Sequence, residues 1–325
     1  MTTLREHLLN DGPLERVVGR VRSSEPGPTL MVVAGIHGNE PASVLAARRV
    51  FAQLQAENLP LRGDFAVLAG NLGALRQGER GITRDLNRGW TRRNLESLPR
   101  GVPGLAAVTR RSPSPEDREQ RDLFEAIELL RRDARGPVTF MDLHTTSAPG
   151  IPFAMVRNAP EQRAFAEQFA LPLIMGLLEL VDHTLLEFMR SEGCLTFGVE
   201  AGQNDAESSI DHHESVLWQA LVSAGIAFAA DVDLAFHRRR LLDACGHLPH
   251  VTEVEHRHSI APEDGFRMEP GFGNIQRVQA GQLLARDHSG EIRAPRNCVL
   301  LMPLYQSQGD DGFFLGREMG PRISA

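Results

Sequence analysis

Residues able to bind a metal ion or to move protons recur at the ends of apolar runs in this sequence. His37 and Glu40 lie three residues apart in GIHGNEP, which directly follows the apolar run TLMVVA. His144 ends the run PVTFMDLH, and Glu200 ends the run CLTFGVE. Two histidines and one glutamate are a ligand set for catalytic zinc that leaves a fourth position to water.

Each of these residues also has an ordinary structural role when taken singly. A histidine at a strand end is commonly a hydrogen-bonded surface or core residue, and Glu40 suits the first turn of a helix, where the dipole favours an acid. Asp142 could simply orient His144 or belong to the sheet. Their matching positions at strand ends favour a metal site over separate structural roles.

The elements that must position these residues alternate between strand and helix. The predicted strands are short apolar runs at 29–36, 64–71, 137–144 and 194–200. The predicted helices have helical periodicity and cover 41–59, 116–133 and 208–226. This alternation predicts an α/β fold with a doubly wound, mainly parallel sheet. In such sheets sites gather outside the carboxyl ends of the strands, so the candidate residues should converge on one crevice.

The pattern of predicted secondary structure changes near residue 235. Short strand-like pieces punctuated by glycine and proline follow, and no helical period survives. We therefore predict an α/β domain over 1–235 and a smaller β-rich domain over 236–325. Residues 90–115 are polar and rich in proline, and they predict a long surface loop.

Composition excludes several classes of function. The 325 residues are 42% hydrophobic and 24% charged with net charge −7, and arginine is scattered, so a nucleic-acid partner is not expected. Apolar runs fall short of the ~20 residues of a membrane span, so no membrane partner is expected either. The sequence contains no lysine, which excludes Walker-A nucleotide binding and Schiff-base chemistry.

The cysteines and the N-terminus predict a cytoplasmic protein. Cys194, Cys245 and Cys298 are far apart and odd in number, which suits reduced thiols and neither a disulfide framework nor a CxxC site. Charges stand in residues 1–18 where a signal peptide would have its apolar region.

The remaining histidines fit a metal site less well. His212 and His213 lie in a helix-start signal, DHHES, where surface polar residues are expected. His256 and His258 flank Arg257 and share one strand face, but no third ligand is near in sequence. Metal binding is not expected at either pair.

Planar hydrogen-bond donors concentrate between the second and third predicted strands. The segment NLGALRQGERGITRDLNRGW contains Arg80, Arg84, Asn87 and Arg88. Such donors suit a carboxylate or an oxyanion, although charge alone would indicate a solvated loop.

Four motifs in order, GIHGNE, DLNR, DLH and GVEAG, resemble the succinylglutamate desuccinylase/aspartoacylase family, relatives of the zinc carboxypeptidases. The resemblance covers roughly residues 30–230. It implies a sheet of the zinc-carboxypeptidase type and one zinc ion per chain, with His37, Glu40 and His144 as ligands.

The resemblance also assigns roles to residues near the metal. Arg80 matches the arginine that polarises the scissile carbonyl, and Glu200 matches the general acid/base. Residues matching carboxylate-binding positions of the substrate site are Asn87, Arg88 and, ten residues before Glu200, Arg190. Asp85 and Asp142 match positions whose carboxylates orient the arginine and histidine side chains.

One departure from the family pattern concerns a late tyrosine that faces substrate. It would fall near GDDGFFLGRE, where this chain has Phe313 and Phe314, and the only tyrosine is Tyr305. The departure argues against importing the exact specificity of aspartoacylase.

The resulting hypothesis is zinc-assisted hydrolysis of a linear amide in a small anionic N-acyl amino acid. A zinc carboxypeptidase or peptide amidase is the alternative within the same chemistry. A zinc-binding structural or regulatory module is the alternative outside it, and Glu200 argues against that, because a structural site needs no nearby base. The protein could form a homo-oligomer, and the sequence does not decide its oligomeric state.

Overall fold

The computed structural model describes residues 3–98 and 113–322, and an eleven-stranded sheet runs through them. The order in that sheet is β1-β3-β2-β4-β7-β5-β6-β8-β14-β13-β10. Its strands are β1 Val17–Arg22, β2 Thr29–Ala34, β3 Asp64–Ala69, β4 Val138–Thr146, β5 Phe153–Met155, β6 Leu173–Met175, β7 Leu195–Gln203, β8 Pro249–Ser259, β10 Gln276–Val278, β13 Cys298–Leu301 and β14 Asp311–Arg322.

Four neighbouring parallel strands, β3, β2, β4 and β7, form the core of the α/β part of this sheet. Every residue of β2 and β3 is buried, as expected for strands covered by helices on both faces. These are the four strands predicted from the apolar runs, and the prediction of a doubly wound, mainly parallel sheet is confirmed.

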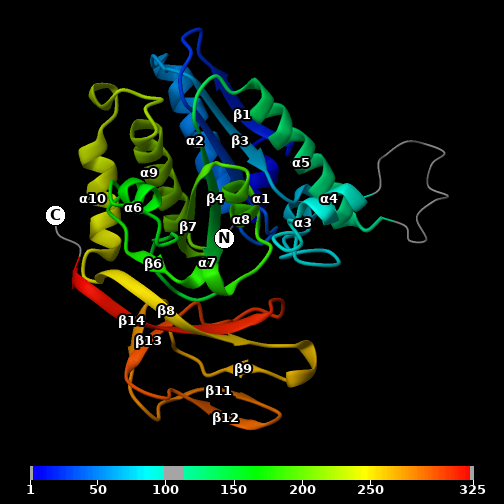
Figure 1. Cartoon of the computed structure of the whole chain (residues 1–325), viewed down its shortest axis with the longest axis vertical. Coiled ribbons are helices and arrows are strands. Elements are labelled where there is room, and N and C mark those ends of the chain that lie inside the picture. The colour runs from blue at the N-terminus through cyan, green and yellow to red at the C-terminus, as the bar shows by residue number, and fades with distance from the viewer. Residues whose placement is uncertain (1–2, 99–112, 323–325) are drawn as a thin grey trace.

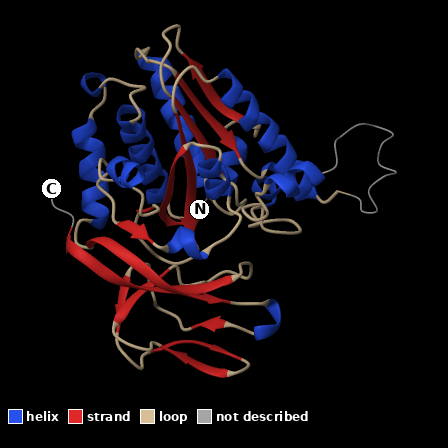
Figure 2. Ribbon diagram, viewed as in Figure 1, coloured by secondary structure: helices blue, strands red, loops and turns tan. Residues whose placement is uncertain are grey.

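Helices cover both faces of the sheet (Figures 1 and 2). They are α1 Leu4–Asn10, α2 Ala42–Glu57, α3 Leu72–Gln77, α4 Arg92–Ser97, α5 Pro115–Asp133, α6 Pro160–Ala166, α7 Leu177–Leu180, α8 Leu185–Ser191, α9 Glu207–Ser223 and α10 Leu234–Cys245. Single 3-10 turns lie at Ala229–Asp231 and Pro262–Asp264. The three predicted helices correspond to α2, α5 and α9.

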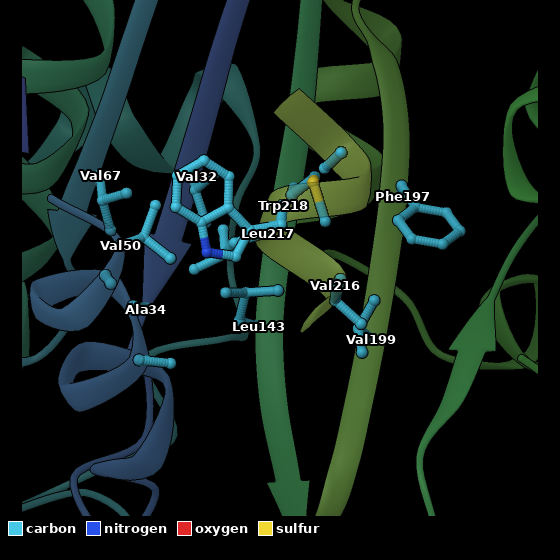
Figure 3. Packing of buried hydrophobic residues seen from close by; sticks show 14 of the residues in the cluster. Val32, Ala34, Val50, Val67, Leu143, Phe197, Val199, Val216, Leu217 and Trp218 are labelled. Atoms are coloured by element: carbon cyan, nitrogen blue, oxygen red, sulfur yellow. The ribbon is translucent and has the colours of Figure 1, made fainter. Parts of the chain in front are cut away.

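Alternate residues of β2 enter two different cores. Val32 and Ala34 pack with α2 and α9 in one cluster, whereas Met31 and Val33 pack with α5 and α8 in the other. Figure 3 shows the first cluster, in which Trp218 lies over the strands beside Val32. Side chains of a strand point alternately to opposite faces, so a strand apolar at every position must be covered twice.

The longest helix, α5, begins and ends where its sequence predicts. Ser114 accepts a hydrogen bond from the amide of Asp117, and the Asp117 carboxylate accepts one from the amide of Ser114. Pro115 occupies the first helical position, which has no intrahelical use for an N–H. Arg131 and Arg132 in the last turn complement the helix dipole.

The C-terminal part of the chain consists mostly of antiparallel strands, in yellow to red in Figure 1. β8 pairs in parallel with β6 and antiparallel with β14, so the main sheet continues into this region. A separate three-stranded sheet contains β9 Arg267–Met268, β11 Leu283–Asp287 and β12 Gly290–Arg293. The predicted β-rich character is confirmed, while a domain boundary between 235 and 236 stays a prediction.

The prediction that no helix follows residue 235 is wrong. Helix α10 occupies Leu234–Cys245 and packs against α9. Its buried residues, His237, Leu241 and Cys245, are four apart, but arginines at 238–240 lie between them. The buried face of this helix is narrow and has few apolar side chains, so the sequence shows no clear helical periodicity.

Two other predictions concern loops and thiols. Within the predicted loop at 90–115, residues 92–97 form α4, and 99–112 lie outside the described residues. All three cysteines are free, as predicted. Across residues 3–98 and 113–322, no helix is long and apolar enough to cross a membrane.

Candidate active site

The turn after β2 directs His37 and Glu40 toward the same point. Gly35 has φ +67°, a left-handed conformation that L side chains rarely adopt. At Gly38 an added Cβ would lie 2.0 Å from the carbonyl carbon of Ala74, so no larger residue fits there. These two glycines let the chain turn sharply between strand and helix, as the sequence predicts.

Two neighbouring parallel strands supply the other polar side chains. His144 on β4 lies opposite Glu200 on β7 in the register of the sheet. The amide of Thr145 donates to Glu40 Oε2 at 3.1 Å, which ties the end of β4 to the turn after β2. Residues more than a hundred positions apart therefore meet at the carboxyl ends of the strands, as expected.

His37, Glu40 and His144 form a buried group that can hold a metal ion. One ligand atom from each lies within 4.8 Å of the other two. His37 Nδ1 is 2.8 Å from Glu40 Oε1, and His144 Nδ1 is 3.2 Å from Glu40 Oε2. In the part of the chain that the structure describes, this is the only such group of His, Cys, Asp and Glu.

The other ring nitrogen of each histidine contacts a carboxylate. His37 Nε2 lies 3.1 Å from Asp85 Oδ1, and His144 Nε2 lies 3.0 Å from Asp142 Oδ2. This arrangement fixes the Nε2–H tautomer and leaves Nδ1 free to coordinate, as in many metal-ligating histidines. The donor set therefore fits a divalent metal, and Asp85 and Asp142 lie where supporting carboxylates were predicted.

The charges of the group are set by proximity inside a buried site. Burial opposes ionisation of Glu40, but His37 and His144 beside it hold the pKa of its carboxyl below the ordinary value. Burial likewise opposes protonation of His144, yet Asp142 and Glu40 raise the pKa of its ring well above the ordinary value. Both pKa shifts result from strong attraction between the Glu40 carboxylate and the imidazoles. A bound cation would replace the protonated imidazoles as the positive charge that attracts this carboxylate.

Glu200 differs from Glu40 in having little to stabilise its charge. Burial raises the pKa of Glu200 to about 8, with a further contribution from Glu40, against opposing effects of His144 and Arg80. Its Oε2 atom has no hydrogen-bond partner among the described residues. A carboxyl group with this pKa can both accept and donate a proton near neutral pH.

Arg80 is held over the metal group by two carboxylates. Its Nη2 lies 2.9 Å from Asp85 Oδ2, and its Nη1 lies 3.5 Å from Glu40 Oε1. Asp85 also accepts a hydrogen bond of 2.7 Å from the amide of Asn87. Asp85 thus connects Arg80, His37 and the following loop in one network.

Asn87 and Arg88 lie at the site with most of their polar atoms engaged. Asn87 Oδ1 accepts from the amide of Leu185 at 2.9 Å. Arg88 Nη2 contacts Asp310 Oδ1 at 3.1 Å and Asp311 Oδ2 at 3.3 Å. Asp311 begins β14 and Asp310 directly precedes it, and no pattern in the sequence predicts either acid at this site.

One pocket brings together seven of the eight predicted site residues. These are His37, Glu40, Arg80, Asn87, Arg88, His144 and Glu200. The rest of its wall is mainly apolar and comes from residues 145–147, β5, the segment 177–186 and residues 302–314.

The structure does not bring Arg190 to this pocket, which corrects the prediction. Arg190 lies in the last turn of α8 with its side chain 41% exposed, and it forms an ion pair of 2.7 Å with Glu187. Phe188 and Met189 fill the buried face of the helix, so the next residue points outward. Spacing from Glu200 cannot reveal the direction of a helical side chain.

The histidines at 212 and 213 are buried in α9, contrary to the prediction of surface positions. His212 Nδ1 donates to the carbonyl of Ala201 at 2.7 Å. His213 is fully buried, and neither ring nitrogen has a hydrogen-bond partner in the described residues.

His258 on β8 has a packing role. Its ring stacks on Phe313 with 4.7 Å between the ring centroids.

Glu116 is a supporting residue that the sequence analysis missed. This buried side chain accepts hydrogen bonds from the amides of Ile82 and Thr83 and from the Thr83 hydroxyl. It thereby fixes the loop that carries Arg80. The signal in the sequence was an acid in the first turn of α5, which the helix dipole alone would explain.

Comparison with known proteins gives a consistent result. A family model described as the succinylglutamate desuccinylase/aspartoacylase catalytic domain matches residues 26–215. Succinylglutamate desuccinylase of Pseudomonas paraeruginosa is 36% identical over 132 residues, which are 39% of each chain. The same enzyme of Pseudomonas aeruginosa is 36% identical over 92 residues, 28% of this chain and 27% of the relative. The matched stretches thus span well under half of these relatives.

Solved structures resemble almost the whole chain. A succinylglutamate desuccinylase/aspartoacylase from Rhodobacter sphaeroides has TM-score 0.63 at 16% identity, covering 93% of this chain and 88% of that one. The ectoine utilization protein EutE (DoeB) from Ruegeria pomeroyi has TM-score 0.63 at 17% identity, covering 92% and 87%. At such identities the likeness shows the fold. Because the family model matches more than half of the sequence, the chain belongs to the succinylglutamate desuccinylase/aspartoacylase family.

Proposed function

We propose that this protein is a zinc-dependent deacylase that hydrolyses the amide of a small N-acyl amino acid in the cytoplasm. The observation that carries the proposal is the shared pocket of Glu200 and the His37, Glu40 and His144 donors. A buried carboxyl group with an unpaired oxygen beside a metal-binding group is what amide hydrolysis requires. The three free thiols support the assignment to the cytoplasm, because reduced cysteines are typical of cytosolic proteins.

Zinc is the metal that the donor set favours, with His37, Glu40 and His144 as the residues that would hold it. Two imidazoles and one carboxylate suit Zn²⁺ in catalytic sites. A bound ion supplies Lewis acidity, which polarises an amide carbonyl and makes water a better nucleophile at neutral pH. Asp85 and Asp142 orient the two rings for this task.

Glu200 acts as the general base and then as the general acid. It removes a proton from the attacking water and delivers it to the amide nitrogen as the C–N bond breaks, releasing an acid and an amine. A raised pKa suits both steps, because the group holds and releases the proton near the working pH. Positioned proton transfer of this kind contributes about 10²–10⁴-fold in rate.

Arg80 stabilises the negative charge that develops on the carbonyl oxygen. Asp85 holds the guanidinium through Nε and Nη2, while Nη1 faces the metal group. Donors that are fixed in advance cost no reorganisation during reaction. Asn87 and Arg88, which line the pocket next to this group, orient the carboxylate of the amino-acid half.

A small substrate is favoured over a polypeptide because the C-terminal strands contribute to the pocket wall. Residues 302–304 and 309–311 line the same cavity as the catalytic groups. The side-chain amide of Asn39 donates a hydrogen bond of 2.7 Å to Gln306 Oε1 in that loop, which secures the loop to the α/β part. An extended chain would have to displace this contact, so peptide hydrolysis is the less favoured alternative.

The experiment that tests the proposal measures metal content and amide hydrolysis together. Purified wild type should contain about one zinc per chain and hydrolyse at least one N-acyl amino acid from a panel. Glu200→Gln should keep the metal and lose about 10²–10⁴-fold in kcat.

Glu187→Gln serves as the matched control, because Glu187 pairs with Arg190 outside the pocket. Its activity should match wild type. Equal turnover by Glu200→Gln and wild type would contradict the assigned base, and a zinc-free folded wild type would contradict the metal.

A further inference from the structure

We infer that this pocket accepts a small apolar arm on one side of the scissile amide, in preference to a carboxylate-bearing arm of the same shape. The inference rests on the proposed deacylase function and narrows its substrate class. Such an arm corresponds to a leucine-like side chain or to a short branched acyl chain. The remaining carboxylate of the amino acid would be the substrate's single negative charge.

The first observation is a set of apolar side chains that line the pocket together with the catalytic groups. Met155 on β5, Leu178 on α7, Leu186 on α8 and Phe314 on β14 all line the pocket. The same side chains belong to the buried cluster on that face of the sheet. These four side chains are therefore part of the surface of a packed core, and they carry no hydrogen-bonding group for a substrate arm.

The second observation concerns the position where a phenol was expected. Phe314 lines the pocket, whereas Phe313 points away and stacks on His258. The hydroxyl of Tyr305 donates to the carbonyl of Glu269 and accepts from the amide of Phe272, outside the pocket wall. At this position a polar group on the arm would meet the phenyl ring of Phe314 and not the hydroxyl of a tyrosine.

The third observation is that acids of the chain already satisfy the arginine beside the pocket. Arg88 contacts both Asp310 and Asp311, at 3.1 and 3.3 Å. Arg257 pairs with the same two aspartates, so two cations and two anions balance. A second carboxylate on the substrate would have to compete for Arg88 with Asp310, with Asp311 and with the amino-acid carboxylate that Arg88 is proposed to orient.

The size of the cavity limits the arm. Its volume is about 120 Å³. An engineered apolar cavity of ~150 Å³ binds benzene, so a pocket of this size, which must also hold the amide and the amino-acid carboxylate, has room only for a short arm. Burying an unpaired carboxylate against apolar side chains is costly, whereas burying a methyl group is favourable. The apolar arm and the carboxylate-bearing arm have nearly the same shape, so the difference in charge determines which one the pocket prefers.

The test uses two isosteric pairs of amides with the metal-loaded protein. N-acetyl-leucine is compared with N-acetyl-aspartate, and N-(4-methylpentanoyl)-glycine with N-succinyl-glycine. In each pair an isopropyl group replaces a carboxylate of nearly the same shape. We expect the apolar member to have a kcat/KM at least about 10-fold higher in one pair, and that pair identifies the amino or the acyl side.

Two substitutions then connect the preference to the pocket. Asp310→Asn releases Arg88 from one acid and should shift the kcat/KM ratio toward the carboxylate-bearing arm by about two- to fivefold. Leu178→Asn places an amide in the apolar wall and should reduce the rate with the apolar arm about tenfold. Asp310 is half-exposed, so its variant remains informative if Leu178→Asn fails to fold.

Equal or faster hydrolysis of the carboxylate-bearing member in both pairs would overturn the inference and leave the deacylase function intact. Unchanged ratios in Asp310→Asn, together with unchanged ratios in a folded Leu178→Asn, would also overturn it. Hydrolysis of none of the four amides by zinc-loaded protein would remove the proposed function and the inference with it.

Discussion

The two halves of the pocket come from different parts of the molecule and differ in almost every physical respect. One half lies at the ends of β2, β4 and β7 and consists of buried imidazoles and carboxylates, all of which except Glu200 have defined partners. The other half includes residues 302–314 of the C-terminal strands and is mainly apolar, with two half-buried acids, Asp310 and Asp311, at its edge. Under the proposed function, the first half contains the groups that react, and the second half contacts the rest of the substrate.

The halves also differ in how firmly they are held. Glu40 receives hydrogen bonds or ion-pair contacts from both histidines, Thr145 and Arg80. The loop of the C-terminal half is held by Gln306 to Asn39 at 2.7 Å and by Gln308 to Gly81 at 3.3 Å. Changes in the strand-end half should therefore abolish the reaction, and changes in the C-terminal half should alter binding.

The largest effect should follow loss of the metal ligands. His37→Ala/His144→Ala should lose its zinc and at least about 10³-fold in kcat/KM, because the ion's charge stabilisation is worth several kcal/mol. Metal content by mass spectrometry and turnover of the best N-acyl amino acid measure the two losses together.

His256→Ala/His258→Ala is the matched control for that double substitution. These histidines lie close together on β8, with ring centroids 6.4 Å apart, but belong to no group able to hold a metal among the described residues. The control should keep its zinc. Full zinc content in His37→Ala/His144→Ala would show that the metal binds elsewhere.

The next largest effect should come from Arg80. Arg80→Ala should lower kcat by about 10²–10³-fold with the protein still folded, because one fixed oxyanion donor disappears. Steady-state kinetics on the same substrate measure the loss.

Arg190→Ala provides the comparison for Arg80, since it removes an arginine that lies outside the pocket. Its kinetics should stay within about twofold of wild type, as for most surface substitutions. A large loss with Arg190→Ala, or none with Arg80→Ala, would reverse the two assignments.

The contrast between the halves also explains what the sequence could predict. His37, Glu40, His144 and Glu200 were predictable because each ends an apolar run, and parallel strands bring their carboxyl ends together. The central strands were predictable for the same reason, since a strand buried on both faces is apolar at every position.

The C-terminal half has no such local signal. Asp310 and Phe314 reach the pocket only because β14 pairs with β8, which extends the main sheet beyond β6. That pairing depends on contacts between residues far apart in sequence, which no local pattern records. The direction of Arg190 and the burial of His213 likewise depend on what the neighbouring helix faces cover.

A smaller effect on stability should follow removal of the charge on Glu116, which holds the Arg80 loop. Burial opposes its ionisation, but hydrogen bonds from Thr83 and from the Ile82 amide keep the pKa of this carboxyl below its ordinary value of 4.5. A carboxyl with a lowered folded-state pKa stabilises the fold above pH 4.5 and loses that contribution as pH falls through the folded value.

Glu116→Gln should therefore lower the free energy of unfolding by about 1.5–3 kcal/mol at neutral pH. The difference from wild type should shrink as the pH falls below 4.5. Chemical denaturation at several pH values measures it, with the exposed Glu125→Gln as a control that should show almost no change. A difference that grows on acidification would contradict the assigned direction.

The smallest effect should come from the contact between the halves. Gln306→Ala removes the 2.7 Å hydrogen bond to Asn39 without touching a catalytic group. The loss of one neutral hydrogen bond costs about 0.5–1.5 kcal/mol, so KM should rise about two- to tenfold while kcat stays nearly constant. Ser307→Ala in the same exposed loop should leave both constants unchanged. A fall in kcat with unchanged KM in Gln306→Ala would mean that the loop positions reacting groups, and the separation of reaction from selectivity between the two halves would fail.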